Sequence, residues 1–409
     1  MKLVTLFTSA LLTTALSAQT TVTVTTGPAN AVQTFYSLQN GVQTSVPLAE
    51  WDLAFEITGF TGSILVNTTK GMQVYKAPYA VEQWSMLDTT GLAASWTATH
   101  NSDLTWSSGA LNQGLTANEF DLGWGVYNMI THTVVGDSLF VLKLANGAWK
   151  KLRIDGLATS TYSFTWANID GTNEQTGELN KALFTGRNFG YFSLENNTIL
   201  DREPATTNWD LLFTKYIAFV PTAYGVAGVL HNKNTQVLQV DGVDPSSAEW
   251  WGGAFSADIN TIGYDWKTFN MTTFEYEYAQ DRTYFVQDRV GNIWKLIFTA
   301  YGGGATGDMT FTQELVSATS IEENAAQGTV LVYPNPVRDG QAQLVIDLPA
   351  SSAVLSVIDL SGKLVLQEQL TGLNGLSLRT VGVSGLDQGL YIARVEANGV
   401  SITARLVIE

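Results

Sequence analysis

The chain has 409 residues, of which 45% are hydrophobic, 11% aromatic and only 14% charged, a composition that favours folded domains over disorder. Its formal net charge of −16 disfavours binding to nucleic acid and to anionic membranes. The chain contains no cysteine, which excludes disulfides, thiolate metal sites and cysteine nucleophiles.

The first 18 residues have the anatomy of a cleavable secretory signal. Lys2 precedes an apolar stretch from Leu3 to Leu16, and the small residue Ala18 precedes the expected cleavage site. The stretch is too short for a membrane anchor, and no later run reaches transmembrane length. We therefore expect the protein to be exported.

Two phrases occur twice in the chain, in the same order. An aromatic-Ser-Leu phrase, FYSLQNG and later YFSLENN, is followed each time by Trp-Asp-Leu-x-Phe, within EWDLAFEIT and NWDLLFTKY. Alternation predicts that each Trp-Asp-Leu-x-Phe segment is a strand with one apolar face. We expect Trp51 and Trp209 to be buried in equivalent positions. The shared Asp52 and Asp210 are expected to accept hydrogen bonds from backbone N–H groups at a neighbouring turn.

A second pair of matching segments closes each copy. SLFVLKLANGAWKKLRI (Ser138–Ile154) and TYFVQDRVGNIWKLIF (Thr283–Phe298) each predict a β-hairpin, because each places an Asn/Gly pair between two apolar strands. The offset between the copies shifts along the chain, as expected for a duplication with loop insertions and deletions. We expect two all-β units, over residues 19–180 and 181–318.

The composition changes after residue 318. Residues 319–329 are small and polar, without a strand pattern, and are predicted to be a linker. Residues 330–409 are more aliphatic and contain further hairpins, which predicts a small β-sandwich. The expected fold class is therefore all-β, with two tandem antiparallel units followed by a small sandwich.

The last domain resembles the type A C-terminal sorting domain of the Bacteroidetes type IX secretion system. Four phrases carry this resemblance: VYPNPV, VIDLSGKLV, GLDQGLYIARV and the terminal ARLVIE. It implies passage across the outer membrane by the type IX machinery, and removal of residues 330–409 by a sortase-like transpeptidase. The remaining protein would be anchored at the cell surface or released.

The repeated region is similar to the HmuY family of haem-binding surface proteins. The order of its phrases carries this resemblance: aromatic-Ser-Leu, Trp-Asp-Leu-x-Phe, GWGVYNMITH and FVLKLANGAWKKLRI. The resemblance implies two tandem HmuY-like antiparallel β units ahead of an immunoglobulin-like β-sandwich. It also implies haem or a related porphyrin as the ligand, with a host haemoprotein as a further partner.

Haem iron takes axial ligands from His, Met, Tyr or Cys. His100 and His132 lie on either side of a Trp/Tyr-rich segment in the first copy, and the resemblance implies that this pair holds the iron. Met129 is the nearest alternative ligand. Trp124 and Tyr127 are the aromatic residues expected to line the slot. The alternative interpretation is that the histidines are exposed loop residues without a ligand.

Neither copy contains a nucleophile elbow, a zincin motif, a P-loop or a dinucleotide fingerprint, so a non-catalytic role is expected. A glycosidase-like carboxylate pair stays open, because no spacing singles one out. The alternative function is a structural or adhesive surface module that keeps the scaffold without haem. Adjacent Trp250 and Trp251 would point to opposite faces of a strand, so one of them is expected to be exposed.

Overall fold

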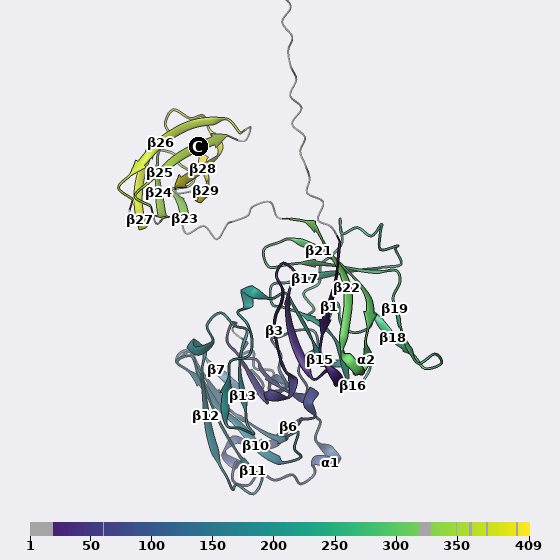
Figure 1. Cartoon of the computed structure of the whole chain (residues 1–409). Helices are drawn as coiled ribbons and strands as arrows, with labels where there is room; N and C mark the ends of the chain where they lie inside the picture. The colour runs from purple at the N-terminus through teal and green to yellow at the C-terminus, as the bar shows by residue number, and fades with distance from the viewer. Residues whose placement is uncertain are drawn as a thin grey trace, which may run out of the picture. The chain divides into compact units, whose positions relative to one another are not determined.

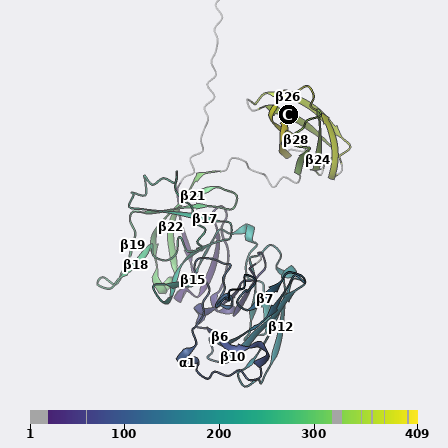
Figure 2. The same cartoon turned by 180° about the vertical axis from the view of Figure 1, so that it is seen from behind.

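The computed structural model describes residues 19–59, 61–318, 329–348, 350–359, 362–373, 375–397 and 400–409. The chain forms two compact units, Met1–Ala318 and Thr319–Glu409, which we call the N-terminal unit and the C-terminal unit. Antiparallel sheets dominate both (Figures 1 and 2), which confirms the all-β class. The expected secretory signal lies outside the described residues, and so does most of the expected linker.

The first lobe of the N-terminal unit contains strands β4 to β14, which run consecutively along the chain. One sheet has the order β14-β13-β4-β5, and in the other β9 joins β6 to the strands around β10. Both sheets contribute to one core that includes Leu53, Phe140 and Phe192. The strands are β4 (Leu53–Glu56), β5 (Ile64–Val66), β6 (Gln73–Ala80), β7 (Gly125–Asn128), β8 (Thr133–Gly136), β9 (Ser138–Lys143), β10 (Trp149–Ala158), β11 (Thr161–Asn168), β12 (Gln175–Asn180), β13 (Phe189–Ser193) and β14 (Thr198–Leu200).

The second lobe combines the two ends of the N-terminal unit. One sheet has the order β1-β22-β21-β20-β17, the next β16-β15-β2-β3, and β18 pairs with β19. Its core includes Val24 and Tyr36 from the start of the chain beside Phe311 from the end. The strands are β1 (Thr20–Thr25), β2 (Val32–Ser37), β3 (Gly41–Pro47), β15 (Leu211–Phe219), β16 (Ala223–His231), β17 (Gln236–Asp241), β18 (Lys267–Asn270), β19 (Glu275–Tyr278), β20 (Arg282–Gln287), β21 (Ile293–Tyr301) and β22 (Asp308–Ser317).

The two predicted hairpins are present as β9–β10 and β20–β21, and Gly147 and Gly291 take the left-handed conformation at their turns, with φ of 87° and 92°.

Helical segments in the described residues are short. The helical segments are α1 (Leu92–Ser95), α2 (Gly303–Thr306), η1 (Pro28–Asn30), η2 (Leu48–Glu50), η3 (Thr68–Lys70), η4 (Val81–Gln83), η5 (Ala110–Asn112), η6 (Lys181–Phe184) and η7 (Thr206–Asn208).

The lobes do not coincide with the copies seen in the sequence. In each lobe the Trp-Asp-Leu strand pairs with the aromatic-Ser-Leu strand of the other copy, because β4 pairs with β13 and β15 pairs with β2. Figure 1 shows the result: the purple strand β1, from the start of the chain, lies beside the green β22 from the end of the same unit. The expected boundary at residues 180/181 therefore does not separate two bodies. Residues 20–47 complete the second lobe, and 181–200 belong to the first.

The two Trp-Asp-Leu segments have equivalent surroundings. Trp51 and Trp209 are buried, at 6% and 2% exposure, as expected from the repeat. Asp52 accepts a hydrogen bond from Leu194 N at 2.7 Å, and Asp210 accepts one from Leu38 N at 2.8 Å. Each aspartate thus satisfies a backbone N–H at the turn of the partner hairpin, which confirms the structural interpretation of this motif.

A third carboxylate, Glu203, is buried beside the pairing of β13 with β4. Its Oε1 accepts a hydrogen bond from Asn188 N at 2.9 Å, and its Oε2 accepts one from the Tyr191 hydroxyl at 2.9 Å. Burial raises the pKa of Glu203 to about 7, against the hydrogen bonds that lower it. The folded state therefore favours the protonated acid, whereas the unfolded chain ionises near its ordinary value.

This pKa predicts that Glu203 contributes more to the stability of the N-terminal unit in acid than above neutrality. The contribution of Glu203 is fully present below its unfolded pKa and is lost as the pH rises through about 7. Between pH 4 and 8 we expect this group alone to change the free energy of unfolding by about 3 kcal/mol. Chemical denaturation of wild type and Glu203→Gln across this range measures it. An identical pH dependence in both proteins would contradict the prediction.

The C-terminal unit is a sandwich of two sheets around one core. The core includes Val337, Leu355 and Val395, and both sheets contribute to it. The sheets have the orders β23-β24-β27 and β26-β25-β28-β29. The strands are β23 (Thr329–Tyr333), β24 (Gln341–Leu348), β25 (Ser352–Asp359), β26 (Leu364–Thr371), β27 (Gly375–Gly382), β28 (Gly389–Ala397) and β29 (Val400–Ile408).

Candidate functional site

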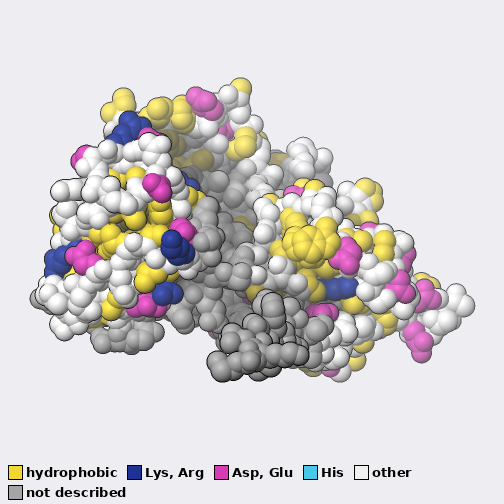
Figure 3. All heavy atoms as spheres, turned by 90° about the horizontal axis from the view of Figure 1, so that it is seen from above, with side chains coloured by type: hydrophobic (Ala, Val, Ile, Leu, Met, Phe, Trp, Pro, Cys, Tyr) yellow, Lys and Arg dark blue, Asp and Glu magenta, His cyan; other side chains and the backbone are white. Residues whose placement is uncertain are grey.

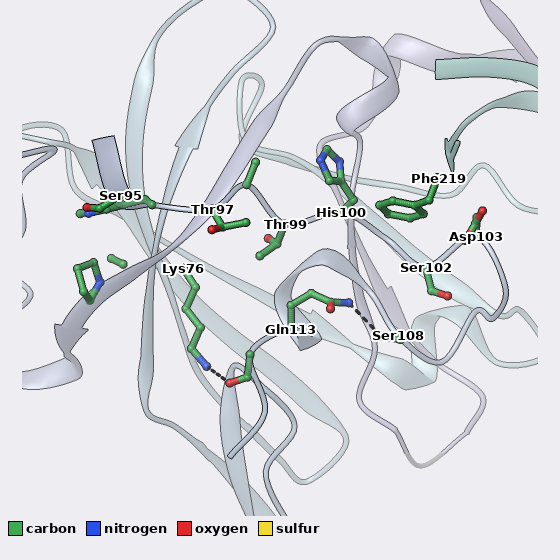
Figure 4. A pocket seen from close by; sticks show the side chains of 15 residues that line it. Lys76, Ser95, Thr97, Thr99, His100, Ser102, Asp103, Ser108, Gln113 and Phe219 are labelled. Carbon is green, nitrogen blue, oxygen red and sulfur yellow. Dashed lines mark hydrogen bonds between the residues drawn. The ribbon is translucent and has the colours of Figure 1, made fainter. Parts of the chain in front are cut away.

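A cleft of about 900 Å³ opens on the N-terminal unit beside His100 (Figure 4). Strand β6 forms one wall with Lys76 and Ala77, and the segment that follows α1 forms another with Trp96 and His100. Phe219, at the end of β15, comes from the second lobe. The cleft therefore contains side chains from both lobes and has the size typical of small-molecule sites.

His100 is half-buried in this wall. Its Nδ1 is buried and has no hydrogen-bond partner among the described residues. Its ring meets the Phe219 ring edge-on, with 6.0 Å between the centroids. Burial lowers the pKa of His100 below its ordinary value, so the imidazole is neutral at pH 7. A neutral imidazole has a lone pair that can accept a hydrogen bond or bind a metal ion.

Two polar side chains elsewhere on the cleft wall, Lys76 and Gln113, are bonded to the protein. The Lys76 ammonium donates to Gly123 O at 2.8 Å and to Gly114 O at 3.2 Å. The Gln113 amide donates to the Ser108 hydroxyl at 3.1 Å. These contacts hold the residues 108–114 against β6 (Figure 4). The cleft therefore presents aromatic and aliphatic walls with a polar margin, which suits a partly apolar ligand.

His132 lies at a β-turn and not in the cleft. It is exposed at the tip of the β7–β8 hairpin, where its Nδ1 is 2.8 Å from the Tyr127 hydroxyl. The β18–β19 hairpin of the second copy ends in the same turn, with Phe274 in the place of His132. Both residues have left-handed φ, 55° and 58°, and both donate their N–H to the asparagine four positions earlier, at 2.9 Å. The position of His132 is therefore explained by the turn.

Met129 is exposed at the same tip, at 60%, and Met271 is its counterpart in the second hairpin. Trp124 is fully buried, and its indole N–H donates to Gly62 O at 2.8 Å. Trp124 therefore belongs to the core of the first lobe, where it offers no face to a ligand. Tyr127 packs at the edge of this core.

The structure brings only one of the predicted site residues to the cleft. His100 lines it, whereas His132, Met129, Trp124 and Tyr127 do not. No second histidine, methionine or tyrosine is among the cleft-lining side chains of the described chain. The cleft does not fit the predicted pair of histidine ligands, because only one of the two imidazoles reaches it. No group of three His, Asp or Glu in the described residues is arranged to hold a metal ion.

The third histidine, His231, has a structural role. It is 1% exposed, and its ring nitrogens lie 3.0 Å from Asn232 O and 2.9 Å from Asp258 O. Its own carbonyl accepts a hydrogen bond from the Trp106 indole at 2.9 Å. Burial lowers the pKa of His231, although its backbone hydrogen bonds raise it. We assign this residue to the contact between the lobes.

Two residues of the site region have no signal in the sequence. Phe219 reaches the cleft from a strand that is 119 positions beyond His100. Trp106 lies in a polar loop, yet it packs against Phe189 of the first lobe and Tyr216 of the second. Both depend on how the lobes pack, which periodicity and motifs do not report.

The aromatic pair in WWGGAF is as exposed as the sequence suggested. Trp251 is 70% exposed, and its ring stacks on that of Trp250 with 4.1 Å between centroids. The chain turns here instead of forming a strand, because Gly253 N donates to Trp250 O and Gly252 has a φ of 72°.

Comparison with known protein families identifies the family that the C-terminal unit matches. Residues 331–409 match the secretion system C-terminal sorting domain, which confirms the type IX resemblance over that unit. The sorting domain implies interaction with the type IX machinery and export to the cell surface or the extracellular space. No curated protein matches the chain. None of the helices in the described residues is long and apolar enough to cross a membrane.

Proposed function

We propose that the protein is a non-catalytic binding protein, exported by the type IX pathway, whose ligand occupies the cleft beside His100. The observation that carries this proposal is the half-buried, neutral imidazole of His100 in the wall of a cleft of about 900 Å³. The absence of any catalytic motif in the sequence supports a binding role.

Haem or a related porphyrin is the first ligand to test, because the HmuY resemblance implies it. His100 is the residue that would supply the axial nitrogen. The Trp96 and Phe219 side chains would contact the apolar macrocycle, and Lys76 stands at the margin where a carboxylate could approach. This assignment replaces the His100/His132 pair by a single histidine from the protein.

Titration of the chain from Gln19 onward with haemin, followed in the Soret region, tests the assignment. We expect His100→Ala to weaken haemin binding at least tenfold, and the matched His132→Ala variant to bind like wild type. Affinity should also fall in acid, at a pH below the ordinary histidine pKa, because burial lowers the pKa of His100. Equal losses of haemin affinity in both variants would support the original prediction that His100 and His132 together bind the iron. No binding by the wild type would remove haem as the ligand.

The second candidate is the structural or adhesive surface module. The stacked Trp250–Trp251 pair favours it, because a tryptophan that is 70% exposed is available to a partner outside the chain. Loss of cell adhesion in Trp251→Ala, together with unchanged ligand binding in the cleft, would support this function. Unchanged adhesion in Trp251→Ala would argue against this function and favour ligand binding in the cleft.

A further inference from the structure

A second cavity, of about 370 Å³, lies on the first lobe. It is bounded by three hairpin turns, those that join β9 to β10, β11 to β12 and β13 to β14. No residue of the cleft beside His100 lines it. We call it the three-turn cavity. Its volume is near the lower end of the range for small-ligand sites, so a ligand of modest size fits.

Amide side chains dominate the lining of the three-turn cavity. Each turn contributes one asparagine: Asn146, Asn173 and Asn197. Gln175 adds a fourth amide from the start of β12. An amide carries two donors and an acceptor side by side, so a ring of amides can both donate to and accept from neighbouring hydroxyl groups.

These amides make weak contacts with one another. Asn197 Nδ2 is 3.4 Å from Gln175 Oε1, and Gln175 Nε2 is 3.4 Å from Asn173 Oδ1. Both distances exceed those of strong hydrogen bonds, so ligand hydroxyls can replace these contacts at small cost. The amides are also exposed or half-buried, and water or a ligand therefore reaches them.

The Asn146 side chain serves its own turn, because its Oδ1 accepts a hydrogen bond from Ala148 N at 2.9 Å, whereas at Asn173 and Asn197 the turn constrains the backbone. Asn173 and Asn197 have φ of 54° and 47°, a conformation that asparagine tolerates and that glycine adopts more readily. Glycine would serve the turns at least as well, as it does at Gly147 with a φ of 87°. Among the described residues, the amides of Asn173 and Asn197 make only the 3.4 Å contacts with Gln175, which a ligand can replace.

Apolar and charged groups complete the lining. Leu144, Leu194 and the buried Trp166 form an apolar floor. One cation, Lys150, and one anion, Glu195, also line the cavity, so their formal charges cancel. The formal net charge of the chain is −16, which further disfavours an anionic ligand.

We propose that the three-turn cavity binds a neutral sugar ring, as a free monosaccharide or as the end of a glycan. A pyranose carries hydroxyl groups around an apolar ring, which matches amides around an apolar floor. This site is independent of the ligand in the cleft beside His100, and its test does not depend on that ligand.

Saturation-transfer NMR with four probes tests the proposal on the chain from Gln19 onward. The probes are D-glucose, D-galactose, D-mannose and N-acetyl-D-glucosamine, each at millimolar concentration. We expect transfer to at least one of them in the wild type. The double variant Asn173→Gly and Asn197→Gly is expected to weaken that binding at least tenfold, because it removes two amides from the cavity. Absence of transfer to all four sugars would overturn the proposal.

The variants keep the fold and isolate the side chains. Glycine is favoured at both left-handed positions, so the double variant should melt no lower than wild type. Asn234→Gly is the matched control: Asn234 also has a left-handed φ, 62°, and it lies outside this cavity. We expect this control to bind sugar like wild type. Gln175→Ala should weaken binding without any change at a turn. Unchanged binding in both the double variant and Gln175→Ala would refute the site.

Discussion

Replacement of Trp209 by alanine is expected to lower the free energy of unfolding of the N-terminal unit by about 3–5 kcal/mol. Trp209 is 2% exposed and meets the Phe35 ring edge-on, with 5.0 Å between centroids. Its indole N–H has no hydrogen-bond partner in the described residues, so the loss is one of packing and cavity formation. Denaturant titration followed by circular dichroism measures the change.

Trp251→Ala is the matched control for this prediction. Trp251 is 70% exposed, so its removal should change the free energy of unfolding by about 0.5 kcal/mol or less. Hydrogen exchange adds a spatial test, because Phe35 lies in β2 and Trp209 shortly precedes β15, the strand that pairs with β2 across the two copies. In Trp209→Ala, we expect amides of residues 32–47 and 211–231 to lose protection together. Equal destabilisation by both variants, or loss of protection confined to 53–200, would contradict the assignment of the lobes.

Deletion of residues 331–409 is expected to abolish delivery to the cell surface. Residues 331–409 match the sorting domain, and the C-terminal unit that contains them has a core of its own, from Val330 to Ile408. The two large cores of the N-terminal unit draw on residues 24–311 only, so the deletion leaves them complete. Fractionation of the native host, with protease shaving of intact cells, should find the shortened protein folded inside the cell envelope.

The reciprocal experiment controls for a general folding defect. A signal-bearing fluorescent protein fused to residues 331–409 should reach the surface or the medium in the same host, while the unfused reporter should not. Surface delivery of the shortened protein at the wild-type level would contradict the assignment of residues 331–409 as the export signal. If the shortened protein is misfolded, seen as a lowered melting temperature, its lost delivery would be due to lost stability and not to the missing sorting domain.

Local patterns in the chain were enough to predict several of its strands and turns. Alternation predicted the strands at Trp-Asp-Leu-x-Phe, and the Asn/Gly pairs predicted the hairpins that turn at Gly147 and Gly291. The sandwich over residues 330–409 was also predicted from its strand and turn pattern. These features can be predicted from the sequence because each depends on residues close together in the chain, through side-chain alternation or through the φ that a turn requires.

The strand pairing between the two copies could not be predicted from such local patterns. Both aromatic-Ser-Leu strands offer similar edges, and both aspartates accept from a backbone N–H, so the two possible pairings look alike in the sequence. The three-dimensional structure pairs β13 with β4 and β15 with β2. Packing over the whole lobe decides between such alternatives, since the strands in residues 20–47 pair with strands that lie far along the chain.

The candidate site shows the same division. The sequence identified His100 as a residue of interest, but paired it with His132 because both flank one aromatic segment. His132 occupies a left-handed turn position that Phe274 fills in the other copy, so local geometry accounts for it. Phe219 meets His100 only because the lobes pack together, with their rings 6.0 Å apart. Composition and spacing report which side chains a chain contains, whereas convergence of distant residues follows from burial and strand pairing across the folded unit.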